Sequence, residues 1–177
     1  MSLKSNFELM ADYNQWMNER TYEAVSTLSA SERTENRGAF FGSIMGTLNH
    51  ILVGDTIWLK RFSGHPAKLE ALDYVRSLQA PKALGSILYA EFDDLREARI
   101  KMDRTIQEFS HELTDEVLLS SLSYSNTKGE PFTKNWGHLI QHFFNHQTHH
   151  RGQVSTLLNQ ANVDVGVTDL LVRIPND

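Results

Sequence analysis

The chain has 177 residues, the length of one ordinary domain, and its 40% hydrophobic and 22% charged residues are typical of a globular protein rather than a disordered one. It contains no cysteine, which excludes disulfides, thiolate metal sites, iron–sulfur clusters and cysteine nucleophiles, and which fits the cytoplasm. The formal net charge of −5 argues against general binding to the phosphate backbone of nucleic acids. Eight histidines are unusual and several lie close together, so function is sought there first.

Neither a membrane anchor nor a leader is expected. Residues 1–6 contain no basic segment followed by an apolar stretch, so they do not resemble a secretory signal. No apolar run approaches the roughly 20 residues that span a bilayer. We therefore expect a cytoplasmic protein with no membrane partner.

Four stretches repeat apolar residues at the three- and four-residue spacing of an amphipathic helix: about 7–28, 43–62, 81–109 and 133–159. Pro81 is suited to the first turn of the third helix. Arg99 interrupts the apolar stripe of that helix, and we expect its side chain to reach outward from the edge of the bundle.

A different pattern separates the third and fourth helices. Residues 118–132 break the helical spacing. Residues 118–125 are β-tolerant and Asn126–Gly129 supplies a turn, so we expect a small hairpin or an extended excursion. The tail from 163 to 177 contains one apolar patch, Leu170–Val172, that could dock as a final helical turn. The predicted fold is all-α: one domain over residues 1–177, an antiparallel four-helix bundle with a small β-like excursion before the last long helix.

Five histidines lie in the fourth helix: His138, His142, His146, His149 and His150. At about 100° per residue, His146 and His150 fall in the apolar seam, while the other three turn toward another side. Imidazoles four residues apart lie on one helical face and can converge on a zinc or nickel ion. Alternatively, both are core histidines that hydrogen-bond to neighbouring groups.

A third ligand would have to come from another helix. His50 is the histidine inside the second helix, on the flank of its apolar face, where it can point across the bundle or remain a boundary residue. Asp55 falls on the apolar face of the same helix, either as a hydrogen-bond acceptor for a ligand histidine or as a partner of a neighbouring helix. The zincin motif is absent, because Gln147 occupies the position of its general-base glutamate.

Three segments resemble motifs of the DinB-like (DinB/YfiT) family: YNQWMN at 13–18, TLNHIL at 47–52 followed by Asp55 and Trp58, and NHQTHHRGQ at 145–153. The resemblance covers nearly the whole chain. It implies a bundle of up-down-down-up topology that is often dimeric. It also implies a divalent metal held by three histidines, which map onto His50, His146 and His150.

Two functions follow from that resemblance. Three neutral histidines leave a tetrahedral metal with one open position, as in catalytic zinc sites, and characterised relatives include thiol S-transferases and a mycothiol-dependent maleylpyruvate isomerase. The first hypothesis is a metal-dependent enzyme that activates a low-molecular-weight thiol or water for transfer to a small electrophile. The second is a non-catalytic metal-binding or stress-response bundle. We expect a small-molecule substrate, a homodimer and no nucleic-acid partner. No catalytic side chain is assigned, and the roles of Arg151 and Gln153 stay open.

Overall fold

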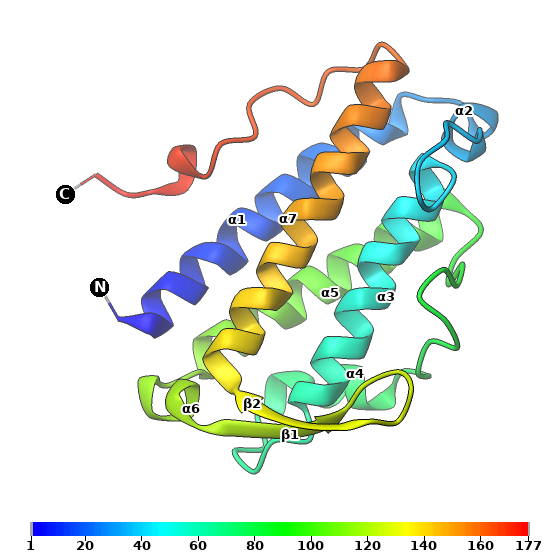
Figure 1. Ribbon diagram of the computed structural model, residues 1–177. Helices are drawn as coiled ribbons and strands as arrows, with labels where there is room; N and C mark the ends of the chain where they lie inside the picture. Colours follow the sequence, from blue (N-terminus) through cyan, green and yellow to red (C-terminus); the bar gives the residue numbers. More distant parts are fainter. Residues whose placement is uncertain (1, 177) are drawn as a thin grey trace.

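The structure is a computed structural model that describes residues 2–176. Most of these residues lie in four long helices: α1 (Leu3–Ser26), α3 (Ile44–Phe62), α5 (Phe92–Glu112) and α7 (Trp136–Gln160) (Figure 1). The short helices are α2 (Ala30–Thr34), α4 (Asp73–Ser77) and α6 (Asp115–Leu119), and two 3-10 turns cover Glu70–Leu72 and Leu170–Arg173. The prediction of a mostly helical protein is confirmed, and the second 3-10 turn falls on the apolar patch of the tail.

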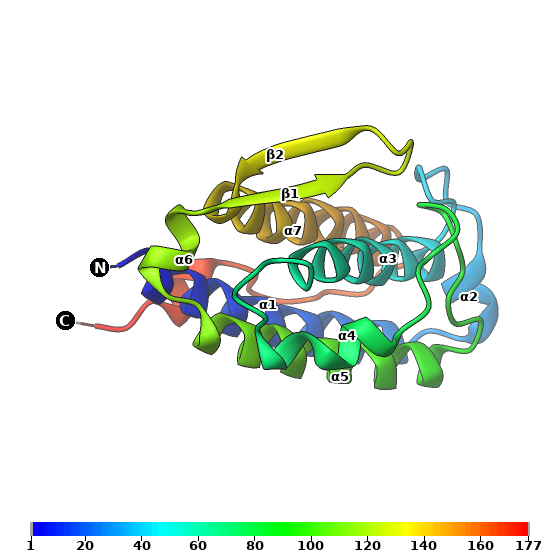
Figure 2. The ribbon, with the colours of Figure 1, turned by 90° about the horizontal axis from the view of Figure 1, so that it is seen from below.

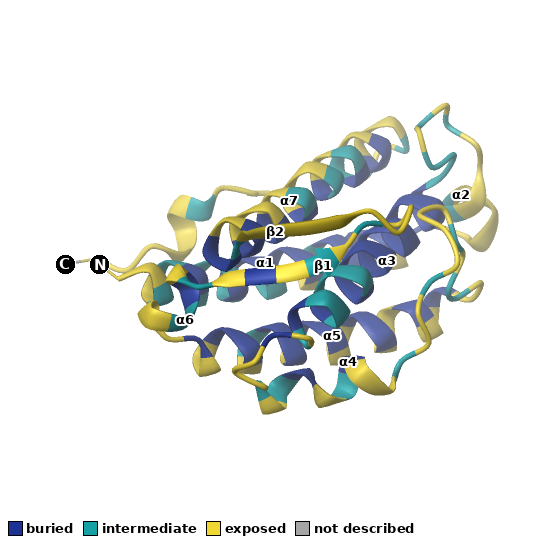
Figure 3. Ribbon diagram, turned by 60° about the horizontal axis from the view of Figure 1, so that its bottom comes forward, coloured by how far each residue is buried: buried dark blue, intermediate teal, exposed yellow. Residues whose placement is uncertain are grey.

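The long helices pack around one apolar core. Helix α1 contacts α5 and α7, and α3 contacts the same two helices, so the buried faces of all four turn inward (Figure 3). Stacked and edge-on aromatic rings fill the end of the core nearest the hairpin, with Phe62 in contact with Phe109, Trp136 and Phe143. None of the helices between residues 2 and 176 is both long and apolar enough to cross a membrane.

The predicted β excursion is an antiparallel hairpin of β1 (Ser121–Ser125) and β2 (Pro131–Asn135). Gly129 in the turn has a φ of +82°, a conformation that glycine adopts without steric cost. The hairpin lies across α3 and α7 (Figure 2). Helix α7 begins at Trp136, slightly later than predicted, because residues 133–135 continue the strand. The side chain of Asn135 then caps the helix by accepting a hydrogen bond from the backbone N–H of His138 at 2.9 Å.

The third long helix begins at Phe92, so the prediction that it starts near Pro81 is wrong. Residues 78–91 run as an irregular segment beside α3, and the buried Asn49 holds them there. Its side-chain oxygen accepts hydrogen bonds from the backbone N–H groups of Leu88 and Tyr89, at 2.8 and 3.0 Å, and its amide donates to the Tyr89 carbonyl. These tertiary bonds satisfy backbone groups that a helix would otherwise pair within itself.

The expectation that Arg99 reaches outward is also wrong. Its side chain is buried, with a relative exposure of 2%, and forms ion pairs with Asp55 of α3 and with Asp103 one turn along α5. Burial disfavours a charged guanidinium, but Asp103 and Asp55 outweigh that cost and raise the pKa of Arg99 above its usual value. The positive charge therefore belongs to the interior.

Candidate metal centre

The structure brings the three predicted ligand histidines together. His50 comes from α3, and His146 and His150 come from successive turns of α7. One ring nitrogen from each lies within 4.8 Å of those of the other two, and their ring centroids are 4.3 to 5.2 Å apart. His50 is buried, while the two histidines of α7 are partly exposed. The site thus spans two helices and is accessible from one side.

The hydrogen bonds of two of these rings fix which nitrogen is free. His50 Nδ1 lies 2.8 Å from the Leu84 carbonyl, and His150 Nδ1 lies 2.8 Å from Gln153 Oε1. Both partners can only accept, so each Nδ1 carries the proton and each Nε2 keeps a lone pair. The amide nitrogen of Gln153 lies 3.2 Å from His149 Nε2, to which it donates when that nitrogen carries no proton. Such partners orient ligand imidazoles in metal sites.

The two Nε2 atoms of His50 and His150 are 3.1 Å apart. With both protons on Nδ1, two lone pairs face one another at that distance, which is unfavourable unless a cation lies between them. Two nitrogens bound to one tetrahedral zinc at about 2.0–2.1 Å would lie about 3.3 Å apart. The donor set and its spacing therefore fit a divalent metal of the zinc type.

Gly54 makes room for His146. A Cβ atom at this position of α3 would lie 2.6 Å from His146 Cε1 and 3.1 Å from its Nδ1. Glycine inside a helix costs about 1 kcal/mol relative to alanine, and here its hydrogen allows the imidazole to approach the backbone of α3. Sequence reasoning missed this residue, although a glycine four positions after His50 was a usable signal.

Electrostatics keep the three imidazoles neutral. Burial lowers the pKa of His50 and of His150 below the ordinary value for histidine. Burial, with the neighbouring imidazoles adding to it, lowers the pKa of His146 to about 3. Metal ligation needs the neutral ring, so the site is ready to bind a cation at neutral pH without losing protons.

Phe41, which sequence reasoning did not single out, forms an apolar wall of the site. Its ring stacks on His50 with centroids 3.7 Å apart and meets His150 edge-on at 5.7 Å. It lies in the connection before α3, where Gly42 adopts a φ of +76°. An aromatic wall restricts the movement of two ligand rings and lowers the local polarity.

A buried polar network lies beside the metal centre and joins all four long helices. Asp55 accepts a hydrogen bond from Gln147 Nε2 at 2.8 Å and pairs with Arg99, so of its two predicted roles the structure supports that of partner to neighbouring helices. Asp103 accepts from Asn14 and Asn18 of α1, at 3.2 and 2.8 Å.

Arg151 completes this network. The guanidinium hydrogen-bonds to Asn14 and lies over the ring of Tyr13, 5.6 Å from its centroid. Its role is thus packing against α1, whereas Gln153 orients His150. Residues of the Tyr-Asn motif and of the last histidine motif therefore meet inside the bundle, and the network fixes the rotation of α7 on which His146 and His150 depend.

The remaining histidines lie outside the triad. His142 packs against Trp58 with centroids 5.0 Å apart, and His149 contacts Gln153. His65 is buried against Trp136, and the exposed His111 pairs with Glu8. Among residues 2–176, no other group of three or more histidines and carboxylates has the spacing of a metal site.

Comparison with known proteins agrees with the motifs. Residues 1–175 match the family model described as "DinB family". The chain is 23% identical to Protein DinB of Bacillus subtilis (strain 168) over 158 residues, which is 89% of this chain and 87% of that protein.

A solved structure is also similar. The crystal structure of a DinB-like protein from Bacillus cereus ATCC 10987 superposes with a TM-score of 0.55, at 18% sequence identity, over 85% of this chain and 89% of that one. At this identity the likeness concerns the fold alone. The resemblance inferred from the three motifs is confirmed by a family match that extends over nearly every residue. The chain belongs to the DinB family.

Proposed function

We propose that this protein is a divalent-metal-dependent enzyme that activates a low-molecular-weight thiol or water for transfer to a small electrophile. The observation that carries the proposal is the donor set: three neutral imidazoles converge, and among residues 2–176 no fourth histidine or carboxylate joins them. Three protein ligands with an open position are typical of catalytic zinc, whereas structural sites have four. Zinc or nickel is the metal we expect, because both accept imidazole nitrogen.

A bound divalent cation would supply Lewis acidity, lowering the pKa of a thiol or water at the open position. The residues of the chain orient the ligand rings and shield them from water. Leu84 and Gln153 hold the Nδ1 protons of His50 and His150, which keeps both Nε2 atoms directed inward. Phe41 excludes water from one side of the rings.

In the proposed transfer the thiol proton goes to solvent, the sulfur forms a bond to the electrophilic carbon, and the leaving group departs with the electron pair of the broken bond. Apolar walls favour this step because they desolvate the nucleophile.

The test is turnover. Metal-loaded protein is mixed with glutathione or bacillithiol and a model alkyl halide, and loss of free thiol is followed against the uncatalysed rate. We expect catalysis that is lost on chelation, restored by zinc or nickel and absent from His150→Ala, while His111→Ala, at an exposed site, behaves as wild type. Absence of catalysis with either thiol, and with water as the nucleophile, would overturn the enzymatic proposal.

The second candidate is a non-catalytic metal-binding or stress-response bundle. The observation that favours it is that the metal would join α3 to α7, so that it could act as a clip. A metal-bound protein with a fourth protein ligand, seen by X-ray absorption spectroscopy as four protein donors, would support this reading.

We also propose the up-down-down-up order of a four-helix bundle and a homodimeric state. The chain runs in one direction in α1 and α7 and in the opposite direction in α3 and α5 (Figure 1), which supports the first. Sedimentation equilibrium tests the second, and a monomer at tens of micromolar would contradict it.

A further inference from the structure

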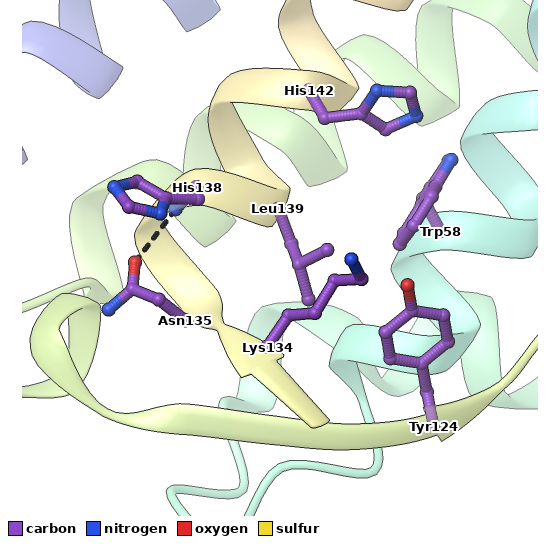
Figure 4. Close-up of a pocket in the computed structure, with 7 residues that line it drawn as sticks. All are labelled: Trp58, Tyr124, Lys134, Asn135, His138, Leu139 and His142. Carbon is purple, nitrogen blue, oxygen red and sulfur yellow. Dashed lines mark hydrogen bonds between the residues drawn. The ribbon is translucent and has the colours of Figure 1, made fainter. Parts of the chain in front are cut away.

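A cavity of about 540 Å³ lies between the hairpin and the helices α3 and α7 (Figure 4). Trp58, Leu139 and His142 form its helical side, and Tyr124 and Lys134 close it from the hairpin. The volume lies within the range of small-molecule sites, about 300–1,000 Å³. The cavity is therefore large enough to hold a small-molecule substrate, which its lining residues can position.

The register of the hairpin explains which side chains enter the cavity. Leu122 pairs with Lys134, and Tyr124 pairs with Phe132, so these four side chains share one face of the hairpin. Leu122 is buried in the core, which identifies that face as the one toward the helices. In Figure 4 the ammonium of Lys134 and the hydroxyl of Tyr124 point toward Trp58. A lysine thus projects toward an aromatic wall, in a cavity whose other polar side chains are uncharged amides, hydroxyls and imidazoles.

A second cation, Arg61, does not line the cavity itself but contacts two residues that do. The guanidinium of Arg61 is 4.6 Å from the ring centroid of Trp58 and 5.1 Å from that of Tyr124. Among residues 2–176, neither Arg61 nor Lys134 forms an ion pair with a carboxylate, and no acidic residue lines the cavity. Although the net charge of the chain is −5, these two cations create a local positive field over an aromatic wall. Such a field attracts an anion.

One wall of the cavity is in contact with a ligand histidine of the metal centre. His142 precedes His146 by four residues on α7, and their ring centroids are 6.2 Å apart. Trp58 follows His50 by two turns on α3, and its ring meets His142 at 5.0 Å. The distance between the cavity wall and a ligand histidine is thus one helical turn, which a small molecule spans.

We propose that this cavity binds the electrophilic co-substrate and selects a small organic anion with a planar apolar body, such as an aromatic carboxylate. The planar body lies between Trp58 and Leu139, and the anionic group pairs with Lys134 and accepts a hydrogen bond from the Tyr124 hydroxyl. The role as co-substrate site rests on the proposed function, whereas the binding chemistry does not.

The first experiment measures binding without turnover. Metal-loaded wild type is titrated with 2-naphthoate and with its neutral isostere 2-naphthamide by calorimetry. We expect naphthoate to bind at least about tenfold more tightly, since a hydrogen bond to a charged group contributes roughly 1.5–3 kcal/mol. Lys134→Met should abolish that preference without weakening naphthamide. Lys128→Met, in the hairpin turn and away from the cavity, should keep it.

Two further variants distinguish a specific loss of anion binding from a loss caused by misfolding of Lys134→Met. Lys134→Arg should restore most of the preference for the anion, and Tyr124→Phe should lower it by several-fold. Equal binding of naphthoate and naphthamide to wild type, or unchanged preference in Lys134→Met, would overturn the assignment.

The second experiment separates this inference from the proposed function. Glutathione or bacillithiol is offered 4-(bromomethyl)benzoate or 4-(bromomethyl)benzamide. In either reaction the sulfur–carbon bond forms, the carbon–bromine bond breaks, bromide leaves with the electron pair and the thiol proton goes to solvent. Enzymatic kcat/KM should favour the benzoate at least about tenfold, the ratio expected from the same hydrogen bond. A binding preference for the anion without turnover would support the anion site and contradict the proposed enzymatic function. Turnover without any preference for the benzoate would support the enzymatic function and contradict the anion site.

Discussion

Replacing Gly54 with alanine should change stability and metal affinity in opposite directions. The new Cβ would lie 2.6 Å from His146 Cε1, whereas carbon atoms in contact prefer about 3.5–4.0 Å, so the imidazole must retreat by roughly 1 Å. Metal–ligand distances tolerate only about 0.2 Å. We therefore expect His146 to stop contributing as a ligand in this variant.

The magnitude follows from two terms. Alanine in place of glycine inside a helix stabilises the metal-free protein by up to about 1 kcal/mol, because partly exposed His146 can rotate away. Loss of ligand geometry should weaken metal binding by about 100-fold or more, comparable to the larger effects of removing groups that orient ligands. At saturating metal, a 100-fold weaker affinity removes about 2.7 kcal/mol of the metal-induced stabilisation.

The assay is urea unfolding of each protein with chelator and with excess zinc. Gly152→Ala is the matched control, because it adds the same methyl group to α7 with no atom within 4 Å of the new Cβ. That variant should gain stability and keep the full zinc-induced shift. If Gly54→Ala keeps the same shift as Gly152→Ala, the close packing of His146 on α3 is not what places the ligand.

Three further changes test the surroundings of the site. His50→Ala or His146→Ala should remove most of the bound metal measured by elemental analysis, whereas His138→Ala should retain it; retention by both ligand variants would contradict the triad. In metal-free protein, burial holds the pKa of His146 at about 3, so below about pH 6.5 the unfolded chain takes up a proton that the folded chain does not. As the pH is lowered from about 6.5 toward 3, the free energy of unfolding should therefore decrease by up to about 1.4 kcal/mol per pH unit. Urea titrations should find a smaller slope for His146→Ala. Asp55→Ala leaves Arg99 with one carboxylate and should cost about 3–5 kcal/mol, checked by chemical denaturation; a loss below 1 kcal/mol would show that the buried pair is not needed.

The buried network that stabilises the bundle also orients the ligand histidines. Asp55 pairs with Arg99 and accepts from Gln147, the residue next to His146. A rotation of α7 by one residue would break these bonds and turn the histidine seam away from His50. The network therefore supports the geometry of the site without touching the metal.

Much of this protein was determined by local sequence. Apolar spacing predicted the helical stretches, since a helix must present one face to the core, and the four-residue step between His146 and His150 placed both imidazoles on one face. The motifs predicted the family that the comparison with known proteins confirmed. Composition alone excluded cysteine ligands and cysteine nucleophiles.

Other features were decided only by tertiary contacts. Residues 78–91 are held irregular by Asn49, so the third helix starts at Phe92 instead of near Pro81. Arg99 looked like a surface residue because its stabilising partner Asp55 is 44 positions away and meets it only when α3 packs against α5. The space that Gly54 leaves for His146 and the approach of Lys134 to Trp58 also depend on contacts between different elements. A sequence pattern reports the periodicity along one element, but it does not report which other element packs against it.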